Sequence, residues 1–245
     1  MEEQQMRRLA KKLTGEEMTN ADVDEMVNKV AGSIRAFALD MRRGMYDDGK
    51  MYLAVVNTVR ALGYGEKRLV CLRFLHSAAV VLPLTGFQSH DALTSFANNY
   101  KPWEIVFLRK AIEEIVDTYA GSALEGSCEG ALEESDLFNL RENTTISEVS
   151  ELIRKLTAEK WLAPSAVVLQ TASLTLGPRA YLELIAFLRD LQVKKCPICT
   201  YELLQGVKCQ ESRCETVVHV SCIDKYESKD LSYKCPTCKK PVRRQ

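Results

Sequence analysis

The sequence of 245 residues has no excess of charge of either sign, because 33 Lys and Arg balance 33 Asp and Glu. A balanced chain has no overall field that would attract nucleic acid or an acidic substrate, so composition indicates neither class of partner. We also expect no secretory signal, since the first segment, MEEQQMRRLAKKL, is charged where a signal peptide has an apolar core. We therefore expect a reducing compartment, in which disulfides are disfavoured.

Long hydrophobic runs are missing as well. The most apolar stretch, LVCLRFLHSAAVVLPL at 69–84, contains Arg73 and His76 and is shorter than the roughly 18–20 residues that a membrane helix needs. We predict a buried element or an irregular insert there, not a membrane span. Cysteine is scarce over most of the chain, and we interpret Cys71 and Cys128 as small buried or idle thiols.

Cysteine is abundant only after residue 195, where seven of the nine cysteines lie. The segment begins CPICTYELLQGVKCQESRCETVVHVSCIDKY and continues to a final CPTC. Together with one histidine, these cysteines form four pairs of possible metal ligands. The pairs are Cys196 and Cys199, Cys209 and Cys214, His219 and Cys222, and Cys235 and Cys238.

This spacing favours a metal site over the other uses of cysteine. Three of the pairs have two intervening residues, and Cys209 and Cys214 have four. Two intervening residues let both side chains of a turn converge on one ion, and zinc is the usual ion for thiolate and imidazole ligands. A thioredoxin-type redox pair needs a strand–helix context and would leave three pairs unused. Eight ligands make two closed sites, so we predict two structural zinc ions that supply most of the folding free energy of this segment. Spacing alone leaves open whether neighbouring or alternate pairs share an ion.

The first part of the chain predicts a helix followed by a hairpin. Residues 20–35 have helical spacing, with Asn20 and Asp22 as capping candidates. AFALDMRRGMY then alternates like a strand, Asp48-Gly49 is a turn signal, and MYLAVVNT offers a second strand. Helix and hairpin form the closing half of a winged-helix domain, whose opening half would come from the short helix MRRLAKKL. Residues 59–100 show no clear period.

A second winged helix is predicted after Trp103. WEIVFLRKAIEEIVDTY is an amphipathic helix, 120–136 is interpreted as a small-residue acidic linker or loop, and 144–162 is a helix that opens with Thr145 and Glu148 in capping-box spacing. AVVLQT and SLTL can pair as a hairpin, and Gly177-Pro178 starts a helix that reaches Leu191. Lys and Arg do not outnumber Glu on the candidate recognition helix 146–161. Phosphate binding needs such an excess, so we expect these domains to bind protein, with weak or no direct DNA binding.

Two winged helices followed by this finger resemble one family, the RING-like non-SMC-element subunit of the SMC five-six genome-maintenance complex. The segments DDGKMYLAVVNT, FLRKAIEEIV, KLTAEKWL, LTLGPRAYLEL and CPICTYELLQGVKC are similar to that family's segments, in its order. The ligand order of four Cys, one His and three Cys resembles a variant RING, between RING and PHD fingers. The resemblance implies an α+β multidomain protein in which tandem winged-helix domains precede a small zinc-stabilised variant RING finger.

The resemblance also implies domain limits and a ligand arrangement. We expect a partial first winged helix over 1–60, an insertion or irregular segment over 61–100, a second winged helix over 101–192 and the variant RING finger over 193–245. RING and PHD fingers use a cross-brace, in which alternate pairs share an ion. One zinc would then be held by Cys196, Cys199, His219 and Cys222, and the other by Cys209, Cys214, Cys235 and Cys238.

The function implied by the resemblance is that of an E3 ubiquitin ligase subunit acting in nuclear DNA repair and recombination, with a MAGE-domain subunit and a kleisin subunit as partners. A RING contributes no catalytic residue; it binds a ubiquitin-charged conjugating enzyme and holds the thioester in a reactive pose. The resemblance puts that surface at Pro197, Ile198, Pro236 and Thr237. Lys239 stands where active RINGs often have an arginine that bridges to ubiquitin, and it lacks the planar guanidinium fork. We therefore expect weak or partner-dependent activity.

A non-catalytic role competes with this interpretation. Ile198 and Pro236 can equally be residues that only pack their own loops, and the finger can be a PHD-like docking module of an interaction scaffold. A reader of basic histone tails would need an acidic or aromatic pocket, whereas residues 194–245 contain 11 Lys and Arg against 6 Asp and Glu. The charge of this segment disfavours a basic tail and would tolerate DNA or an acidic partner.

Overall fold

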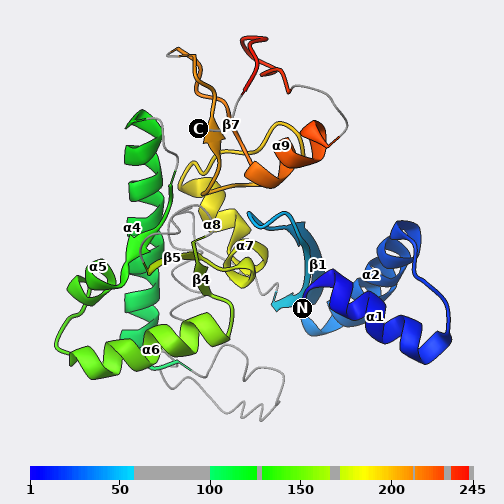
Figure 1. The fold of residues 1–245 in the computed structure, drawn as a ribbon. Helices are drawn as coiled ribbons and strands as arrows, with labels where there is room; N and C mark the ends of the chain where they lie inside the picture. The colour runs from blue at the N-terminus through cyan, green and yellow to red at the C-terminus, as the bar shows by residue number, and fades with distance from the viewer. Residues whose placement is uncertain (58–99, 126–128, 166–171, 212, 229–232, 243–245) are drawn as a thin grey trace.

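The computed structural model describes residues 1–57, 100–125, 129–165, 172–211, 213–228 and 233–242. The elements form an N-terminal part of two helices and a hairpin, a central part of helices around a small sheet, and the cysteine-rich finger (Figure 1). Our expectations for the insertion, for Cys71 and Cys128, and for the strand AVVLQT fall outside the described residues. Within the described ranges, no helix is both long enough and apolar enough to cross a membrane.

The N-terminal part follows the predicted order of helices and strands. It contains α1 (Glu3–Thr14), α2 (Asn20–Ile34), the 3-10 helix η1 (Arg35–Phe37), β1 (Leu39–Met45) and β2 (Met51–Asn57). The prediction of Asn20 as a cap is wrong, because the cap is Thr19. Its hydroxyl accepts from the Asp22 N–H while the Asp22 carboxylate accepts from the Thr19 N–H, which is a capping box.

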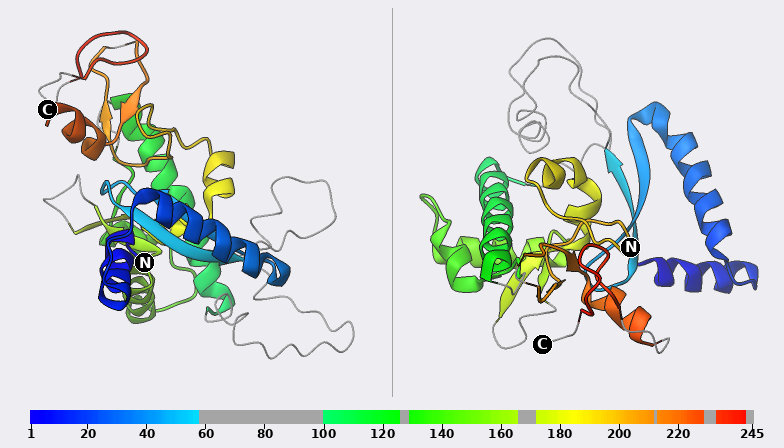
Figure 2. Two further views of the ribbon diagram at one scale, coloured as in Figure 1. Left: turned by 90° about the vertical axis from the view of Figure 1, so that its right-hand side faces the viewer. Right: turned by 90° about the horizontal axis from the view of Figure 1, so that it is seen from above.

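The hairpin β1–β2 lies between the two N-terminal helices and the helix α7 (Pro178–Glu183), as Figures 1 and 2 show from different sides. Its strands pair antiparallel from Leu39 opposite Asn57 to Met45 opposite Met51. The turn that joins them needs a left-handed residue, which is Gly49 with φ +77°. The strands thus hold the turn at 46–50 at the end of the hairpin.

The central part is built as a winged helix. It contains α4 (Pro102–Glu125), β3 (Leu132–Glu133), α5 (Glu134–Asn139), α6 (Ile146–Ala158), β4 (Leu162–Pro164) and β5 (Ser173–Leu176), and the strands lie in the order β3-β5-β4. The apolar faces of these elements meet in a buried core that includes Ile112, Ile115, Leu152, Leu156 and Leu176. The capping box between Thr145 and Glu148 is confirmed.

Three details of this part differ from the predictions. The linker expected at 120–136 is largely structured, because α4 continues to Glu125 through Ala and other small residues, and the acidic residues after β3 begin α5, where carboxylates favour a helix N-terminus. The strand at 173–176 is confirmed as β5, but its described partners are β3 and β4. The helix expected over 178–191 is split at Leu184, where the backbone leaves the helical region, into α7 and α8 (Ile185–Asp190).

The finger contains β6 (Val207–Lys208), β7 (Val217–Val218) and α9 (Val220–Glu227). Its buried apolar side chains, among them Leu203, Leu204 and Ile223, belong to the same continuous core as the winged helix. A backbone hydrogen bond of 2.8 Å from the Gly130 N–H to the Leu204 carbonyl also joins the two parts. The expected fold class is confirmed as a mixed helix and strand protein with a RING-like C-terminal part that is packed against the rest of the chain.

Candidate metal centres and their surroundings

The first candidate centre joins the start of the finger to the start of α9. Cys196 and Cys199 lie in one turn, while His219 is the cap of α9 and Cys222 lies in its first turn. The four ligand atoms all lie within 4.8 Å of one another. His219 Nδ1 is 3.2 Å from the Cys199 sulfur and 3.9 Å from the Cys222 sulfur. The structure therefore brings the first and third ligand pairs together.

The second candidate centre joins the second and fourth pairs, Cys209 and Cys214 with Cys235 and Cys238. The sulfurs of Cys209 and Cys238 are 3.4 Å apart, and those of Cys214 and Cys235 are 3.5 Å apart. The Thr216 hydroxyl lies 3.3 Å from the Cys214 sulfur. None of the seven cysteines in the two clusters is in a disulfide.

Both clusters have the size of a tetrahedral metal site. Zinc bonds of about 2.3 Å to sulfur and about 2.0 Å to nitrogen put tetrahedral sulfurs about 3.8 Å apart and a sulfur and a nitrogen about 3.5 Å apart. The observed separations of 3.2 to 3.9 Å are close to these values. Two soft donor sets, one of three sulfurs and a nitrogen and one of four sulfurs, can thus each hold a metal ion and suit zinc.

The crowding of the thiols also favours a cation. In the first cluster, hydrogen bonds from Cys199 and Cys222 hold the pKa of Cys196 far below its usual value, and the same crowding raises the pKa of Cys222 well above it. In the second cluster burial raises the pKa of Cys209 to about 12. Such a cluster cannot carry several thiolates without a compensating positive charge. A divalent ion would hold all of them deprotonated and release their protons.

His219 contacts the rest of the molecule through its second nitrogen. Nδ1 faces the sulfurs, and Nε2 lies 3.1 Å from Oδ1 of Asp47, in the hairpin turn. Burial opposes the charged imidazolium, but the contacts with Asp47 and the cysteines raise the pKa of His219 to about 11. The sequence marks residues 47–50 only as a turn, and no local pattern relates Asp47 to a histidine in the finger.

The residues expected to contact a conjugating enzyme lie at the surface around the two centres. Pro197, Pro236 and Thr237 are exposed, whereas Ile198 is half-buried and packs against the core. The Thr237 hydroxyl is 2.8 Å from that of Thr216. Lys239 is exposed and adopts a left-handed conformation with φ +63°, because its N–H turns back to the Cys235 carbonyl.

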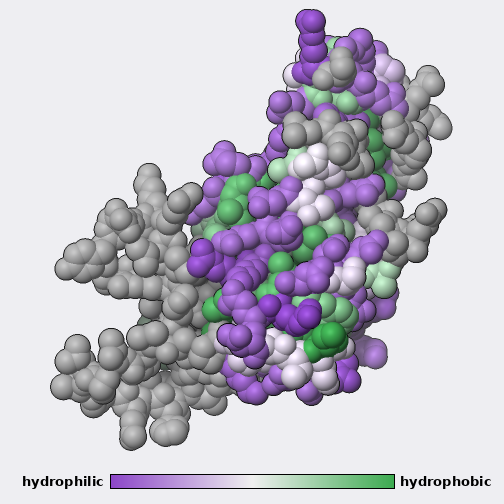
Figure 3. Space-filling model, turned by 90° about the vertical axis from the view of Figure 1, so that its left-hand side faces the viewer, coloured by the Kyte–Doolittle hydropathy of each residue, from purple (hydrophilic) through white to green (hydrophobic). Residues whose placement is uncertain are grey.

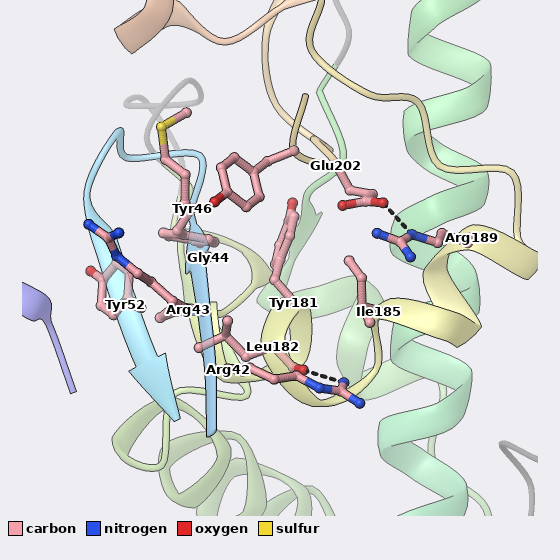
Figure 4. Close-up of a pocket in the computed structure, with 13 residues that line it drawn as sticks. Arg42, Arg43, Gly44, Tyr46, Tyr52, Tyr181, Leu182, Ile185, Arg189 and Glu202 are labelled. Atoms are coloured by element: carbon pink, nitrogen blue, oxygen red, sulfur yellow. Dashed lines mark hydrogen bonds and ion pairs between the residues drawn. The ribbon is translucent and has the colours of Figure 1, made fainter. Parts of the chain in front are cut away.

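A cavity of about 220 Å³ lies where the hairpin, α7, α8 and the finger meet (Figure 4). Four tyrosines line it: Tyr46, Tyr52, Tyr181 and Tyr201. Its arginines are already engaged within the chain. Arg42 donates to the Leu182 carbonyl at 2.9 Å, and Arg189 pairs with the buried Glu202 at 2.5 Å. The cavity is therefore part of the interface between the three parts of the molecule.

Comparisons with known proteins agree with this architecture. A family model described as a RING-like domain matches residues 196–238, and one described as the Nse1 non-SMC component of the SMC5-6 complex matches residues 88–184. A solved structure titled "Nse1-Nse3-Nse4 complex" contains a chain that aligns with all of this chain and with 91% of its own length, with a TM-score of 0.64 and 21% sequence identity. A search of curated proteins gave no match.

Proposed function

We propose that this chain, which resembles the Nse1 component of the SMC5-6 complex, is a RING-type E3 ubiquitin ligase subunit of that complex. We propose further that it acts in nuclear DNA repair. The solved complex that contains the similar chain also contains Nse3 and Nse4. A MAGE-domain subunit and a kleisin subunit are the corresponding partners that we propose here. The observation that carries the proposal is the meeting of alternate ligand pairs, which is the cross-brace arrangement of RING fingers.

The proposed metal ions are two structural zincs with the eight ligands named above. Each donor set is complete with four protein atoms, so neither site has an open position for a substrate. The chain accordingly offers the reaction no metal-bound nucleophile and no catalytic side chain from these clusters. Its contribution is to bind a ubiquitin-charged conjugating enzyme and to restrict the thioester to a reactive pose.

The surface proposed for the conjugating enzyme is held in shape by the metal sites. Pro197 and Ile198 lie between the ligands Cys196 and Cys199, and Pro236 and Thr237 lie between the ligands Cys235 and Cys238, so the positions of all four follow from those of the ligands. Exposed prolines offer apolar contact area with little conformational entropy to lose. Lys239 follows the last ligand and is exposed, so a bound ubiquitin can reach it. Its ammonium is a point charge, which is a weaker bridge than a guanidinium with two parallel donors.

The charge pattern of α6 supports protein binding by the winged helix. Arg154 and Glu151 are both exposed and 3.7 Å apart, and Lys155 lies 3.4 Å from Glu104. Basic groups that have acidic neighbours do not form the unopposed positive stripe that phosphate contacts need. Figure 3 shows hydrophilic residues interspersed with separate hydrophobic patches on the side of the molecule where α4, α5 and α6 lie.

A ubiquitin-discharge assay with and without the MAGE-type partner tests the proposal. Ile198→Ala should lower discharge by about tenfold, because it truncates the apolar contact at the centre of the surface without removing a ligand. Val207→Ala, which shortens a half-buried side chain elsewhere in the finger, is the matched control. Lys239→Arg should raise discharge. If no conjugating enzyme supports discharge with the partner present and two metal ions bound, the chain is a scaffold that uses the finger for docking alone.

A further inference from the structure

The surroundings of the first centre point to a function for a residue outside the finger. We propose that Asp47 is a positioning residue for His219, and that metal binding at the first centre thereby holds the hairpin, the winged helix and the finger together. This inference rests on the proposal that the first cluster holds a metal ion, and it is independent of ubiquitin transfer. Its starting observation is the distance of 3.1 Å between Asp47 Oδ1 and His219 Nε2.

Both members of this pair are removed from water. Their side chains are 2% and 0% exposed, and neither Oδ1 nor Nε2 has a hydrogen-bond partner elsewhere in the described part of the chain. The contact is less well aligned than an ideal hydrogen bond, although its length is that of a close ion pair. A buried carboxylate oxygen that lacks a partner is costly, so Oδ1 of Asp47 and Nε2 of His219 depend on each other.

The orientation of the imidazole gives this pair a chemical consequence. Nδ1 is the nitrogen that faces the sulfurs of Cys199 and Cys222, so a metal ion in the first cluster would bind there. The proton of a metal-binding neutral imidazole then resides on Nε2, where Asp47 can accept it. A carboxylate in this position fixes the tautomer and the ring orientation and makes the histidine a stronger ligand.

The second oxygen of Asp47 links the same carboxylate to the winged helix. The Tyr181 hydroxyl, on α7, donates to Asp47 Oδ2 at 2.6 Å. The ring of Tyr181 packs edge-on against Tyr46 with 5.3 Å between centroids, and the Tyr46 hydroxyl donates to the Leu176 carbonyl at 2.8 Å. Figure 4 shows Tyr181 standing between the hairpin and α8. The Asp47 carboxylate of the hairpin therefore accepts a hydrogen bond from Tyr181 of the winged helix and contacts His219 of the finger.

The tip of the hairpin fits closely against the helix that carries the ligand. A Cβ atom on Gly49 would lie 2.4 Å from the Cβ of Ser221, which is one residue before Cys222. The Lys225 ammonium, one turn further along α9, donates to the Gly49 carbonyl at 3.3 Å. This close fit sets the distance between the hairpin and His219, so that Asp47 reaches the imidazole.

The test compares Asp47→Asn with Asp48→Asn in the full chain. The asparagine keeps the shape of Asp47 and removes its charge. Asp48 is exposed in the same turn and accepts from the Tyr52 hydroxyl at 2.8 Å, which makes it the matched control. Release of bound zinc into a chromogenic chelator is followed over time. Cadmium-113 NMR of the cadmium-loaded protein assigns the release phases, since a site with three sulfurs and a nitrogen and a site with four sulfurs give separate signals.

We expect Asp47→Asn to accelerate metal release from the first centre by about 10- to 100-fold, the usual cost of losing such a partner, and to leave the second centre and the control unchanged. Equal acceleration of both centres would indicate general destabilisation and would overturn the positioning role, as would unchanged release. If Asp47→Asn fails to fold, Tyr181→Phe serves instead, because it removes only the second partner of the carboxylate. It should accelerate release from the first centre alone, by less.

The link between metal and hairpin is tested by hydrogen exchange. Removing the metal of the first centre should increase amide exchange over 39–57, because the tip then loses its ordered partner. Unchanged exchange after metal loss would contradict this part of the inference. A chain that binds no metal at all would contradict the proposed zinc sites first, whereas a chain with two metals and no response to Asp47→Asn would contradict this inference alone.

Discussion

The two candidate metal centres have almost the same ligands and a similar burial, yet their surroundings differ. The first centre contacts the hairpin through His219 and Asp47, and through Asp47 it is connected to Tyr181 of the winged helix. At the second centre the Thr216 hydroxyl, which also belongs to the finger, lies 3.3 Å from the Cys214 sulfur and is hydrogen-bonded in turn to the Thr237 hydroxyl at 2.8 Å. Ligand chemistry alone therefore does not determine what a structural metal stabilises.

The difference follows from where the ligands lie in the fold. His219 and Cys222 belong to α9, whose first turn faces the hairpin, whereas the second centre gathers residues from the loops around β6, β7 and the final turn. A metal at the first centre would order elements that are far apart in sequence. A metal at the second centre would order only the finger. Three experiments can sharpen or break this comparison.

The largest effect is expected from removing one ligand of each centre. Cys222→Ala and Cys209→Ala should each reduce the metal content from two ions to one, since structural zinc in small fingers contributes about 10–16 kcal/mol of apparent binding free energy. Only Cys222→Ala should also raise hydrogen exchange over the hairpin at 39–57. Metal analysis and exchange mass spectrometry measure both outcomes. Equal hydrogen exchange over the hairpin in the two variants would show that both centres, or neither, stabilise the hairpin.

A smaller effect is expected from the apolar core of the winged helix. Leu156→Ala empties a side-chain volume that is fully buried, and this should lower the free energy of unfolding by about 2–5 kcal/mol. Because Leu156 lies on α6, outside the finger that carries the ligands, both metal ions should stay bound, which chemical denaturation and metal analysis can check. Ile146→Ala, at a side chain that is 55% exposed, is the control and should change stability by less than about 0.5 kcal/mol. Loss of either metal ion in the Leu156 variant would show that metal binding depends on the packing of the winged-helix core.

The smallest effect is expected from Thr216→Val, which removes a hydroxyl beside the second centre. Burial opposes ionisation of Cys235, but the N–H groups of Cys238 and Thr237 and the Thr216 hydroxyl lower the pKa of Cys235 to about 6. Without that hydroxyl the thiolate is less stable, by about 1 kcal/mol. Metal release from the second centre should therefore be a few-fold faster, and release from the first should not change. A response at the first centre would contradict the separation of the two.

The sequence revealed those features of the fold that depend on local spacing. Helical periodicity indicated α2, α4 and α6, and the Asp48-Gly49 turn between two alternating segments indicated the hairpin. The ligand pairs could be recognised because the two members of each pair are close in sequence. Which pairs meet could not be derived from spacing, and only the resemblance to RING fingers supplied the grouping that the structure displays.

Other features depend on contacts between distant residues and left no local pattern. The pairing of β5 with the three-residue strand β4 is too short to produce an alternation, and the break at Leu184 occurs within a continuous apolar periodicity. Asp47 looked like an ordinary turn aspartate, because its role arises only when the hairpin packs against α9. Buried polar partners of this kind are determined by tertiary packing, which one sequence does not display.

The close approach of the hairpin turn to α9 has a consequence for inherited variation. Position 49 combines a left-handed backbone, φ +77°, with a space in which a Cβ would meet Ser221 at 2.4 Å. Every missense change that one base substitution can produce in a glycine codon adds a Cβ, so each such allele would bring both defects at once. Codon 49 should therefore be among the least tolerant positions in a saturation screen, and Ser221→Gly, the change that removes the Cβ at position 221, is where suppressors of the steric defect should be sought.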